Sequence, residues 1–331
     1  MQQRHQIIRI EALVLPFHLS IVDRIAWRES QPCCSRAKTC SPCAMTTVYL
    51  NGEYVPKERA LISVEDRGFL FGDGIYEGVR AVGGQLFEWD LHAARLVNGL
   101  AGLRIEFGAA RVAELKPICE RLVRDNGLAD AEAFVYIAVT RGAAPRTHHF
   151  SPPGTPPTVY ASVTKFVPPR ELRQKGAHAI TFEDMRWSRC DLKTVNLLGN
   201  VLARQAAVEA NAFEAILVRD GIVTEGAATT VFAVIGTLRT HPLGHAILPS
   251  VTRAVVLDCI AQLKLPVREQ AVTEGELRAA QEVFVCGTVT DIMPIVSLDK
   301  GSIGTGKPGP ITGRLREALE TRVYTAAPSL R

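Results

Sequence analysis

Lys193 is the residue of this chain whose type and surroundings best suit covalent chemistry. It lies in the run Asp191-Leu192-Lys193-Thr194-Val195-Asn196, just before a helical pattern that begins at Leu197. An apolar setting favours the neutral amine of a lysine, and a neutral amine can form a Schiff base with an aldehyde. Taken alone, the same segment also fits a solvent-exposed lysine beside the start of a helix.

Three further groups have the chemistry that pyridoxal phosphate requires of a protein. Glu225 stands in a run of small residues, where its carboxylate could keep a pyridine nitrogen protonated so that the ring acts as an electron sink. The segment Ser250-Val251-Thr252-Arg253 opens a predicted helix and could bind a phosphate, and Gly287-Thr288 could add backbone donors. Taken alone, Glu225 also fits a solvated turn glutamate and Ser250 an ordinary helix cap. It is the combination of these groups with Lys193 that favours pyridoxal phosphate.

The elements that must position these groups form a mixed α/β, or α+β, pattern. Asn51-Gly52 and Gly83-Gly84 each separate two β-type runs and are strong hairpin signals. Hairpins favour antiparallel or mixed sheets over a doubly wound parallel sheet. Further strands are predicted at 133–140, 158–164, 214–219, 222–224, 230–235 and 283–287, and helices at 91–100 (capped by Asp90), 112–126, 197–211, 251–263 (capped by Ser250), after a capping box at 273–276, and at 311–325.

The length of 331 residues exceeds that of a usual single domain, so two domains are expected. The Pro-rich stretch 166–169 predicts a linker between a small N-terminal α/β domain, 45–165, and a larger C-terminal domain, 170–331, which carries Lys193. Residues 1–44 fit no regular pattern and are expected to be a disordered or non-native extension, with Met45 as the natural start.

Composition and charge favour small-molecule chemistry. Hydrophobic residues make up 47% of the chain and charged residues 22%, and the formal net charge of +4 gives no reason to expect nucleic acid or a membrane surface as a partner. A transmembrane helix needs about 20 consecutive apolar residues, and the sequence has no such run. A cytoplasmic protein is predicted, since the cysteines scattered among apolar residues indicate a reducing compartment.

Cysteines fall into two groups. Four are scattered among apolar residues and are expected to be buried free thiols, typical of a reducing compartment: Cys119, Cys190, Cys259 and Cys286. The other four crowd into residues 33–43, where Cys40-Ser41-Pro42-Cys43 could be half a zinc site or a redox pair. A metal or redox module built on this segment is the alternative from a different class, but no second spaced pair follows, so no metal is predicted.

Long blocks of the sequence, in order and in both predicted domains, resemble the class IV, fold-type-IV pyridoxal-phosphate aminotransferases. Residues 46 to about 320 are most similar to the D-amino-acid (D-alanine) aminotransferase branch of that family. The resemblance implies a two-domain fold with the cofactor between the domains. The matching blocks are residues 65–77 (EDRGFLFGDGIYE), 139–142 (VTRG), 186–193 (RWSRCDLK), 196–199 (NLLG) and 223–226 (VTEG).

The resemblance implies a role for each residue around the cofactor ring. Lys193 would carry pyridoxal 5'-phosphate and then move the proton of the substrate Cα. Glu225 would bind the pyridine nitrogen, and Tyr76 would face the cofactor on the substrate side. Arg186 would stabilise the region around the cofactor.

The phosphate would be bound by Arg95 together with backbone and hydroxyl groups at Val251, Thr252 and Thr288. Three features depart from the D-amino-acid enzymes and bear on cofactor affinity and on the shape of the substrate pocket: Ala227-Ala228-Thr229 replaces a serine-rich stretch, Gly287 replaces a serine, and Pro249 precedes the phosphate helix. Backbone amides can replace the lost hydroxyl groups.

The pair Arg146 and His148 is the most discriminating part of the resemblance. In the D-amino-acid enzymes, an Arg-x-His pair from the neighbouring subunit traps the substrate carboxylate, which implies a homodimer. The expected reaction passes the amino group of D-alanine to 2-oxoglutarate, giving pyruvate and D-glutamate. A branched-chain L-amino-acid aminotransferase and an aminodeoxychorismate lyase remain the alternatives on the same scaffold.

Overall fold

The computed structural model describes residues 46–325 and 327–331, and these residues form one compact unit. The predictions for residues 1–44, including the metal or redox alternative, lie outside the described residues. Among the described residues, no helix is both long enough and apolar enough to span a membrane.

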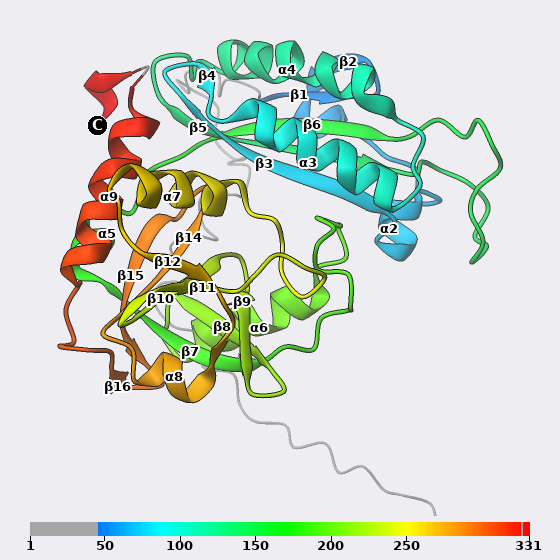
Figure 1. The fold of residues 1–331 in the computed structure, drawn as a ribbon. Coiled ribbons are helices and arrows are strands. Elements are labelled where there is room, and N and C mark those ends of the chain that lie inside the picture. The colour runs from blue at the N-terminus through cyan, green and yellow to red at the C-terminus, as the bar shows by residue number, and fades with distance from the viewer. Residues whose placement is uncertain (1–45, 326) are drawn as a thin grey trace, which may run out of the picture. The chain divides into compact units, whose positions relative to one another are not determined.

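The first sheet has six antiparallel strands in the order β2-β1-β6-β5-β3-β4. Its two outer hairpins turn at Asn51-Gly52 and Gly83-Gly84, as predicted. Helices α3 and α4 cover one face of the sheet (Figure 1). The elements are β1 Thr47–Leu50, β2 Glu53–Pro56, η1 Lys57–Arg59, α2 Arg67–Phe71, β3 Gly74–Val82, β4 Gln85–Leu86, α3 Trp89–Gly102, α4 Gly108–Asp125, β5 Glu132–Thr140 and β6 Val159–Lys165.

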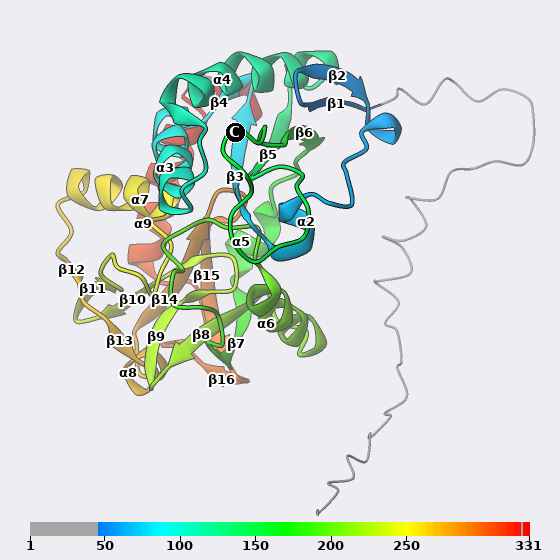
Figure 2. The same ribbon diagram turned by 90° about the vertical axis from the view of Figure 1, so that its right-hand side faces the viewer.

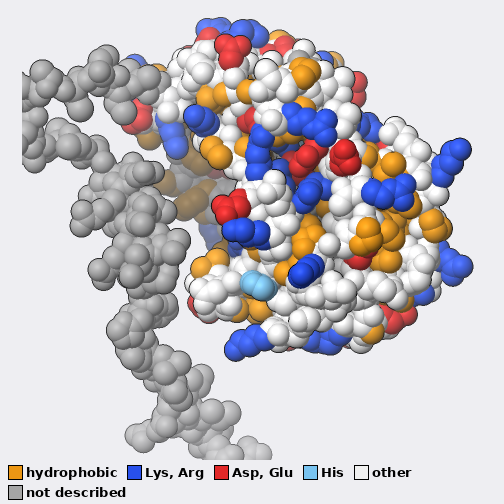
Figure 3. Space-filling model, turned by 90° about the vertical axis from the view of Figure 1, so that its left-hand side faces the viewer, with side chains coloured by type: hydrophobic (Ala, Val, Ile, Leu, Met, Phe, Trp, Pro, Cys, Tyr) orange, Lys and Arg blue, Asp and Glu red, His pale blue; other side chains and the backbone are white. Residues whose placement is uncertain are grey.

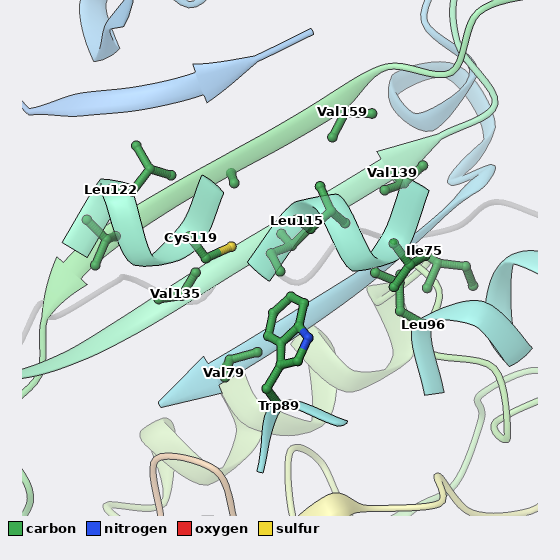
Figure 4. Close-up of a cluster of buried hydrophobic side chains, with 14 of the residues drawn as sticks. Ile75, Val79, Trp89, Leu96, Leu115, Cys119, Leu122, Val135, Val139 and Val159 are labelled. Carbon is green, nitrogen blue, oxygen red and sulfur yellow. The ribbon is translucent and has the colours of Figure 1, made fainter. Parts of the chain in front are cut away.

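The hydrophobic core between the first sheet and its helices follows from the periodic spacing of apolar residues in a strand and in a helix. In β5, Val135, Ile137 and Val139 are fully buried, whereas the residues between them are half-buried, as expected for a strand with one face against a core. Leu115, Cys119 and Leu122 of α4 recur at helical spacing and pack against this face (Figure 4).

The second sheet has ten strands and is mixed, with parallel pairs β15–β7, β7–β8 and β11–β12. Helix α6 packs against β7 and β8, whereas α7 and α9 pack against β14 (Figure 2). The elements are α5 Arg170–Lys175, β7 Ala177–Glu183, α6 Leu198–Glu209, β8 Glu214–Arg219, β9 Ile222–Gly226, β10 Thr230–Ile235, β11 Thr237–Thr240, α7 Val251–Gln262, β12 Val267–Glu269, β13 Val272–Thr273, α8 Glu274–Arg278, β14 Glu282–Gly287, β15 Asp291–Leu298, β16 Gly301–Ser302, α9 Pro310–Val323 and η2 Pro328–Leu330.

Most predicted elements are present, and the predicted mixed fold is confirmed. The Ser250 cap of α7 and the capping box at Thr273 and Glu276 are also confirmed. Every described strand up to Lys165 belongs to the first sheet and every later one to the second, while the predicted domain limits at 166–169 stay a prediction.

The predicted cap of α3 is wrong, and the bounds of two other predicted elements differ slightly from the structure. Asp90 does not cap α3, because the helix begins at Trp89, two residues earlier than predicted, and Glu88 occupies the cap position with a left-handed backbone, φ 52°. Strand β9 extends to Gly226, two residues beyond the predicted end at 224, so Glu225 lies inside the strand and the alternative of a turn glutamate is wrong. Helix α6 begins at Leu198, one residue after the predicted start, and the backbone of Lys193, which precedes it, is hydrogen-bonded to strand β3 of the first sheet.

Buried free thiols are confirmed for the four scattered cysteines, Cys119, Cys190, Cys259 and Cys286. Strand β15 was not predicted from the sequence, and it carries Pro294 in its middle, where a proline usually argues against a central strand. Here the hydrogen-bonded register with β7 begins only at Ile295, so the missing amide of Pro294 breaks no bond on that side.

Candidate active site

A cavity of about 420 Å³ brings together residues that are far apart in the sequence. Strand β3, helix α3, the segment before α6, strand β9, the approach to α7 and the β14–β15 loop all contribute to its wall. Six residues predicted to serve the cofactor or the substrate line it: Tyr76, Arg95, Arg186, Lys193, Glu225 and Thr288.

The backbone around Lys193 is fixed by the start of β3. The amide of Tyr76 donates to the carbonyl of Lys193 at 2.9 Å, and the amide of Val195 donates to the carbonyl of Gly74 at 3.0 Å. The side chain returns to the same strand, because Lys193 Nζ donates to Tyr76 Oη at 3.1 Å and lies 4.2 Å from the centre of that ring. The amine is thus held beside a hydroxyl group at the edge of the cavity.

Glu225 presents a buried carboxylate to the cavity from β9. Its oxygens accept hydrogen bonds from the amide of Leu248 at 3.1 and 3.2 Å and from the guanidinium of Arg186. Arg186 is itself held by Asp184, at 2.8 Å from Nε and 2.9 Å from Nη2. Burial raises the pKa of Glu225, although the charges of Arg186 and Lys193 oppose the shift. Such a carboxylate is suited to a partner that brings its own N–H and positive charge.

Arg95 reaches the cavity from α3 and is oriented by a second buried acid. Its Nε and Nη2 donate to the two oxygens of Glu77 at 2.7 and 2.8 Å, and His92 Nδ1 lies 2.8 Å from the same carboxylate. Burial raises the pKa of Glu77, but the charges and hydrogen bonds of Arg95 and His92 outweigh it and lower the pKa to about 2. Arg95 Nη1 also donates to the carbonyl of Pro249 at 3.1 Å, so the guanidinium lies at the approach to α7.

Unused hydrogen-bond donors gather at this end of the cavity. Ser250 caps α7 by accepting from the amide of Arg253 at 3.2 Å, so Pro249 does not disturb the start of the helix. Among the described residues at this end of the cavity, the backbone amides of Val251, Thr252, Thr288 and Val289 donate to no protein acceptor. The hydroxyl of Thr230, which lines the cavity, is also buried without a partner. Free amides at a helix start and a fixed guanidinium suit a dianionic group.

Two groups of predicted residues lie outside the cavity lining. Val251 and Thr252 have buried side chains next to the lining residue Ser250, so their amides are the groups that could reach a ligand. Arg146 and His148 are exposed on the loop after β5, where both lie beside Phe71, with Arg146 Cζ 5.3 Å from its ring centre. Within a single chain this pair does not join the cavity.

The partners of the two cavity arginines, Asp184 and Glu77, were missed from the sequence. Glu77 gave a usable signal, since it is a charged residue in a strand that is otherwise almost wholly buried, and His92 and Arg95 stand three residues apart on one helix face. Asp184 gave none, because it lies in an irregular segment just after β7.

The chain was also compared with known proteins. The family model described as class IV amino-transferase matches residues 74–298. A D-alanine aminotransferase of Staphylococcus epidermidis is 40% identical over 282 residues, covering 85% of this chain and 99% of the relative. A D-alanine aminotransferase of Bacillus licheniformis is 42% identical over 284 residues, covering 84% and 97%.

Solved structures with the same fold include branched-chain amino acid aminotransferases. The Escherichia coli enzyme matches with a TM-score of 0.77 at 26% identity, covering 82% of this chain and 93% of the other. The T.th. enzyme with pyridoxamine 5'-phosphate matches with a TM-score of 0.76 at 28% identity, covering 86% and 96%. Because the family model spans most of the chain and the D-alanine aminotransferases match almost end to end, the chain belongs to the class IV aminotransferases.

Proposed function

We propose that this protein is a pyridoxal-5'-phosphate-dependent aminotransferase of D-amino acids, with D-alanine and 2-oxoglutarate as substrates and pyruvate and D-glutamate as products. The observation that carries the proposal is the meeting of the Lys193 amine, the buried Glu225 carboxylate and the anion-binding end of the cavity in one space. The relatives named D-alanine aminotransferase support the choice of substrate.

The residues of the cavity fit the cofactor. Lys193 would hold it covalently through Nζ, and Glu225, backed by Arg186, would pair with its ring N–H. The free amides at the start of α7 and in the β14–β15 loop, together with Arg95, would bind its phosphate. When bound, pyridoxal phosphate supplies an electron sink for the charge that develops at the substrate Cα.

The chain's own groups supply proton transfer and orientation. Once its amine is free, Lys193 Nζ would be the base that takes the proton from the substrate Cα and passes it on to the cofactor, and Tyr76 Oη, at 3.1 Å, keeps that amine in place. Glu225 would keep the ring nitrogen protonated, and the charge and hydrogen bond of Arg186 oppose the rise in the pKa of Glu225 that burial causes. Because these groups are held in place, the proton transfer between the bound substrate and Lys193 is an intramolecular step that needs no further collision.

The D-configuration and the homodimer rest on Arg146 and His148. Both side chains are exposed and lie outside their own cavity, which supports a role at the cavity of a second subunit. An arginine fork and an imidazole donor can fix a carboxylate so that one face of the substrate meets the lysine. Exposed apolar side chains on α6, Leu198, Val201 and Leu202, support a subunit interface beside the cavity.

A cytoplasmic location is also proposed, because the four scattered cysteines are buried free thiols. The second candidate is a branched-chain L-amino-acid aminotransferase, favoured by the structural matches at TM-scores of 0.77 and 0.76. Those matches have 26% and 28% identity, whereas the D-alanine aminotransferases have 40% and 42%, so the D-substrate has the better support.

Arg146→Ala tests the carboxylate assignment. Loss of a charge-assisted hydrogen bond costs about 1.5–3 kcal/mol, so the KM for D-alanine should rise by roughly 10- to 100-fold. The kcat should change much less, because the substrate carboxylate is bound in both the ground and the transition state. Steady-state kinetics at saturating 2-oxoglutarate measure both constants.

Arg124→Ala, which removes an exposed arginine from the end of α4, is the matched control and should leave the KM unchanged. If the KM of Arg146→Ala equals that of the wild type, Arg146 does not bind the carboxylate and the support for a D-substrate is reduced to sequence identity.

A further inference from the structure

The loop between β14 and β15 forms one wall of the cavity. Gly287 and Asp291 pair across the hairpin, so Thr288, Val289 and Thr290 form a short loop, closed by a bond from the amide of Thr290 to the carbonyl of Gly287 at 3.1 Å. Gly287 and Thr288 line the cavity at the end where unused amides gather. Whatever holds this loop therefore sets the position of those amides.

Behind the loop, away from the cavity lining, two buried arginines share one carboxylate. Arg80 Nη1 donates to both oxygens of Asp291 at 2.6 and 2.7 Å, and Arg173 Nη1 lies 2.7 Å from Asp291 Oδ2. The side chains are 1%, 2% and 5% exposed for Arg80, Arg173 and Asp291, so water screens these charges little. Asp291 itself has a left-handed backbone, φ 50°, which aspartate and asparagine tolerate.

Arg173, on α5, is hydrogen-bonded directly to the backbone of the loop. Its Nε donates to the carbonyl of Thr290 at 2.9 Å and its Nη2 to the carbonyl of Val289 at 3.1 Å. Together with the contact to Asp291, the guanidinium makes three contacts to three consecutive residues. The helix carrying it is held in turn by Arg316 of α9, which donates to the carbonyl of Arg173 at 2.5 Å.

Arg80 ties the same cluster to the first sheet. It lies on β3, the strand that also carries Tyr76, and it bonds Glu132 of β5 and the hydroxyl of Tyr324, the latter at 2.8 Å. Two guanidinium groups thus face two carboxylates in the buried part of the cluster.

Figure 3 shows the α5 and α9 side of the molecule, where basic and acidic side chains are interspersed on the surface.

We propose that Arg80, Asp291 and Arg173 form a positioning cluster that holds the loop 288–290 in the conformation that binds the cofactor phosphate. The inference rests on the proposed function, since the phosphate is expected at this loop. None of the three residues lines the cavity, so they act through the loop. Without the charge of Asp291, two buried guanidinium groups would have Glu132 as their remaining buried carboxylate, and their repulsion would displace Arg173 and the carbonyl groups it binds.

Asp291→Asn tests the cluster, because asparagine keeps the shape and the backbone conformation while removing the charge. The dissociation constant of pyridoxal phosphate, measured by titrating the apoprotein, should rise about 10-fold, as is typical when a group behind a ligand-binding residue is lost. At saturating pyridoxal phosphate, kcat should stay near the wild-type value. The gain in Tm on adding the cofactor should be smaller than in the wild type.

Arg173→Lys is the second variant, since it keeps a positive charge near Asp291 but cannot reproduce the guanidinium fork that binds both carbonyl groups. It should also weaken cofactor binding, and it decides the question if Asp291→Asn fails to fold. Arg322→Gln is the matched control: it removes ion pairs from Arg322 to Glu88 and Asp258 without touching the loop, and should leave the dissociation constant unchanged.

A purely structural role would lower the Tm of apoprotein and holoprotein equally and leave the dissociation constant unchanged in Asp291→Asn and Arg173→Lys. That result overturns the positioning role. A wild-type protein that binds no pyridoxal phosphate would instead contradict the proposed function, and the two failures are therefore distinguishable.

Discussion

Replacing Lys193 with alanine is expected to lower kcat/KM for D-alanine by about 10⁴-fold or more, because the variant loses both the covalent link to the cofactor and the base at the substrate Cα. The fold should survive, since the bonds that fix this segment to β3 are made by the backbone of Lys193, Tyr76 and Val195 and not by the lysine side chain. Initial rates and the far-ultraviolet circular dichroism spectrum measure the two effects.

The visible absorbance of the purified protein gives a second readout for Lys193→Ala. A cofactor held covalently by this amine gives a visible band, which the variant should lack. Lys116→Ala, at an exposed position on α4, should keep both the band and the activity. A band that persists in Lys193→Ala would place the covalent link on a different lysine.

Glu225→Gln is expected to lower kcat by about 10²- to 10³-fold, the usual cost of removing one fixed electrostatic partner from an active site. The neutral amide cannot keep the ring nitrogen protonated, so the electron sink is weakened. The fold should persist, because Arg186 keeps its two hydrogen bonds to Asp184 at 2.8 and 2.9 Å. The cofactor should stay bound through Lys193, so kcat falls while the visible band remains.

Asp220→Asn is the control for this variant, because it removes a carboxylate from the exposed turn between β8 and β9, where the backbone φ of 51° suits asparagine as well as aspartate. Its kcat should equal that of the wild type. A Glu225→Gln variant with unchanged kcat would show that the buried carboxylate does not act on the ring nitrogen.

The sequence is informative where a function or a turn depends on local residue types. A two-residue hairpin turn requires a positive φ at both of its residues, which Asn51 and Gly52 readily adopt, and the hairpin is found there. Lys193 and Glu225 could be identified because each stands in a short, ordered block that resembles the same family. The alternation in β5 and the helical spacing in α4 likewise predict the core of the first sheet.

Contacts between distant residues could not be predicted in this way. Lys193 is positioned by β3, more than a hundred residues earlier, and Arg80 meets Asp291 across a separation of 211 residues. No local pattern encodes such pairs, because they depend on how two sheets pack. The start of α3 was misplaced for a related reason: Glu88 adopts a left-handed backbone that its residue type does not favour.

The choice between D- and L-substrates is the central claim, and the initial rates of the wild-type protein test it most directly. With 2-oxoglutarate as acceptor, the protein should convert D-alanine to pyruvate and form glutamate of the D-configuration, and it should leave L-leucine unchanged. Turnover of L-leucine with formation of L-glutamate, and none of D-alanine, would contradict the proposal and favour the branched-chain alternative.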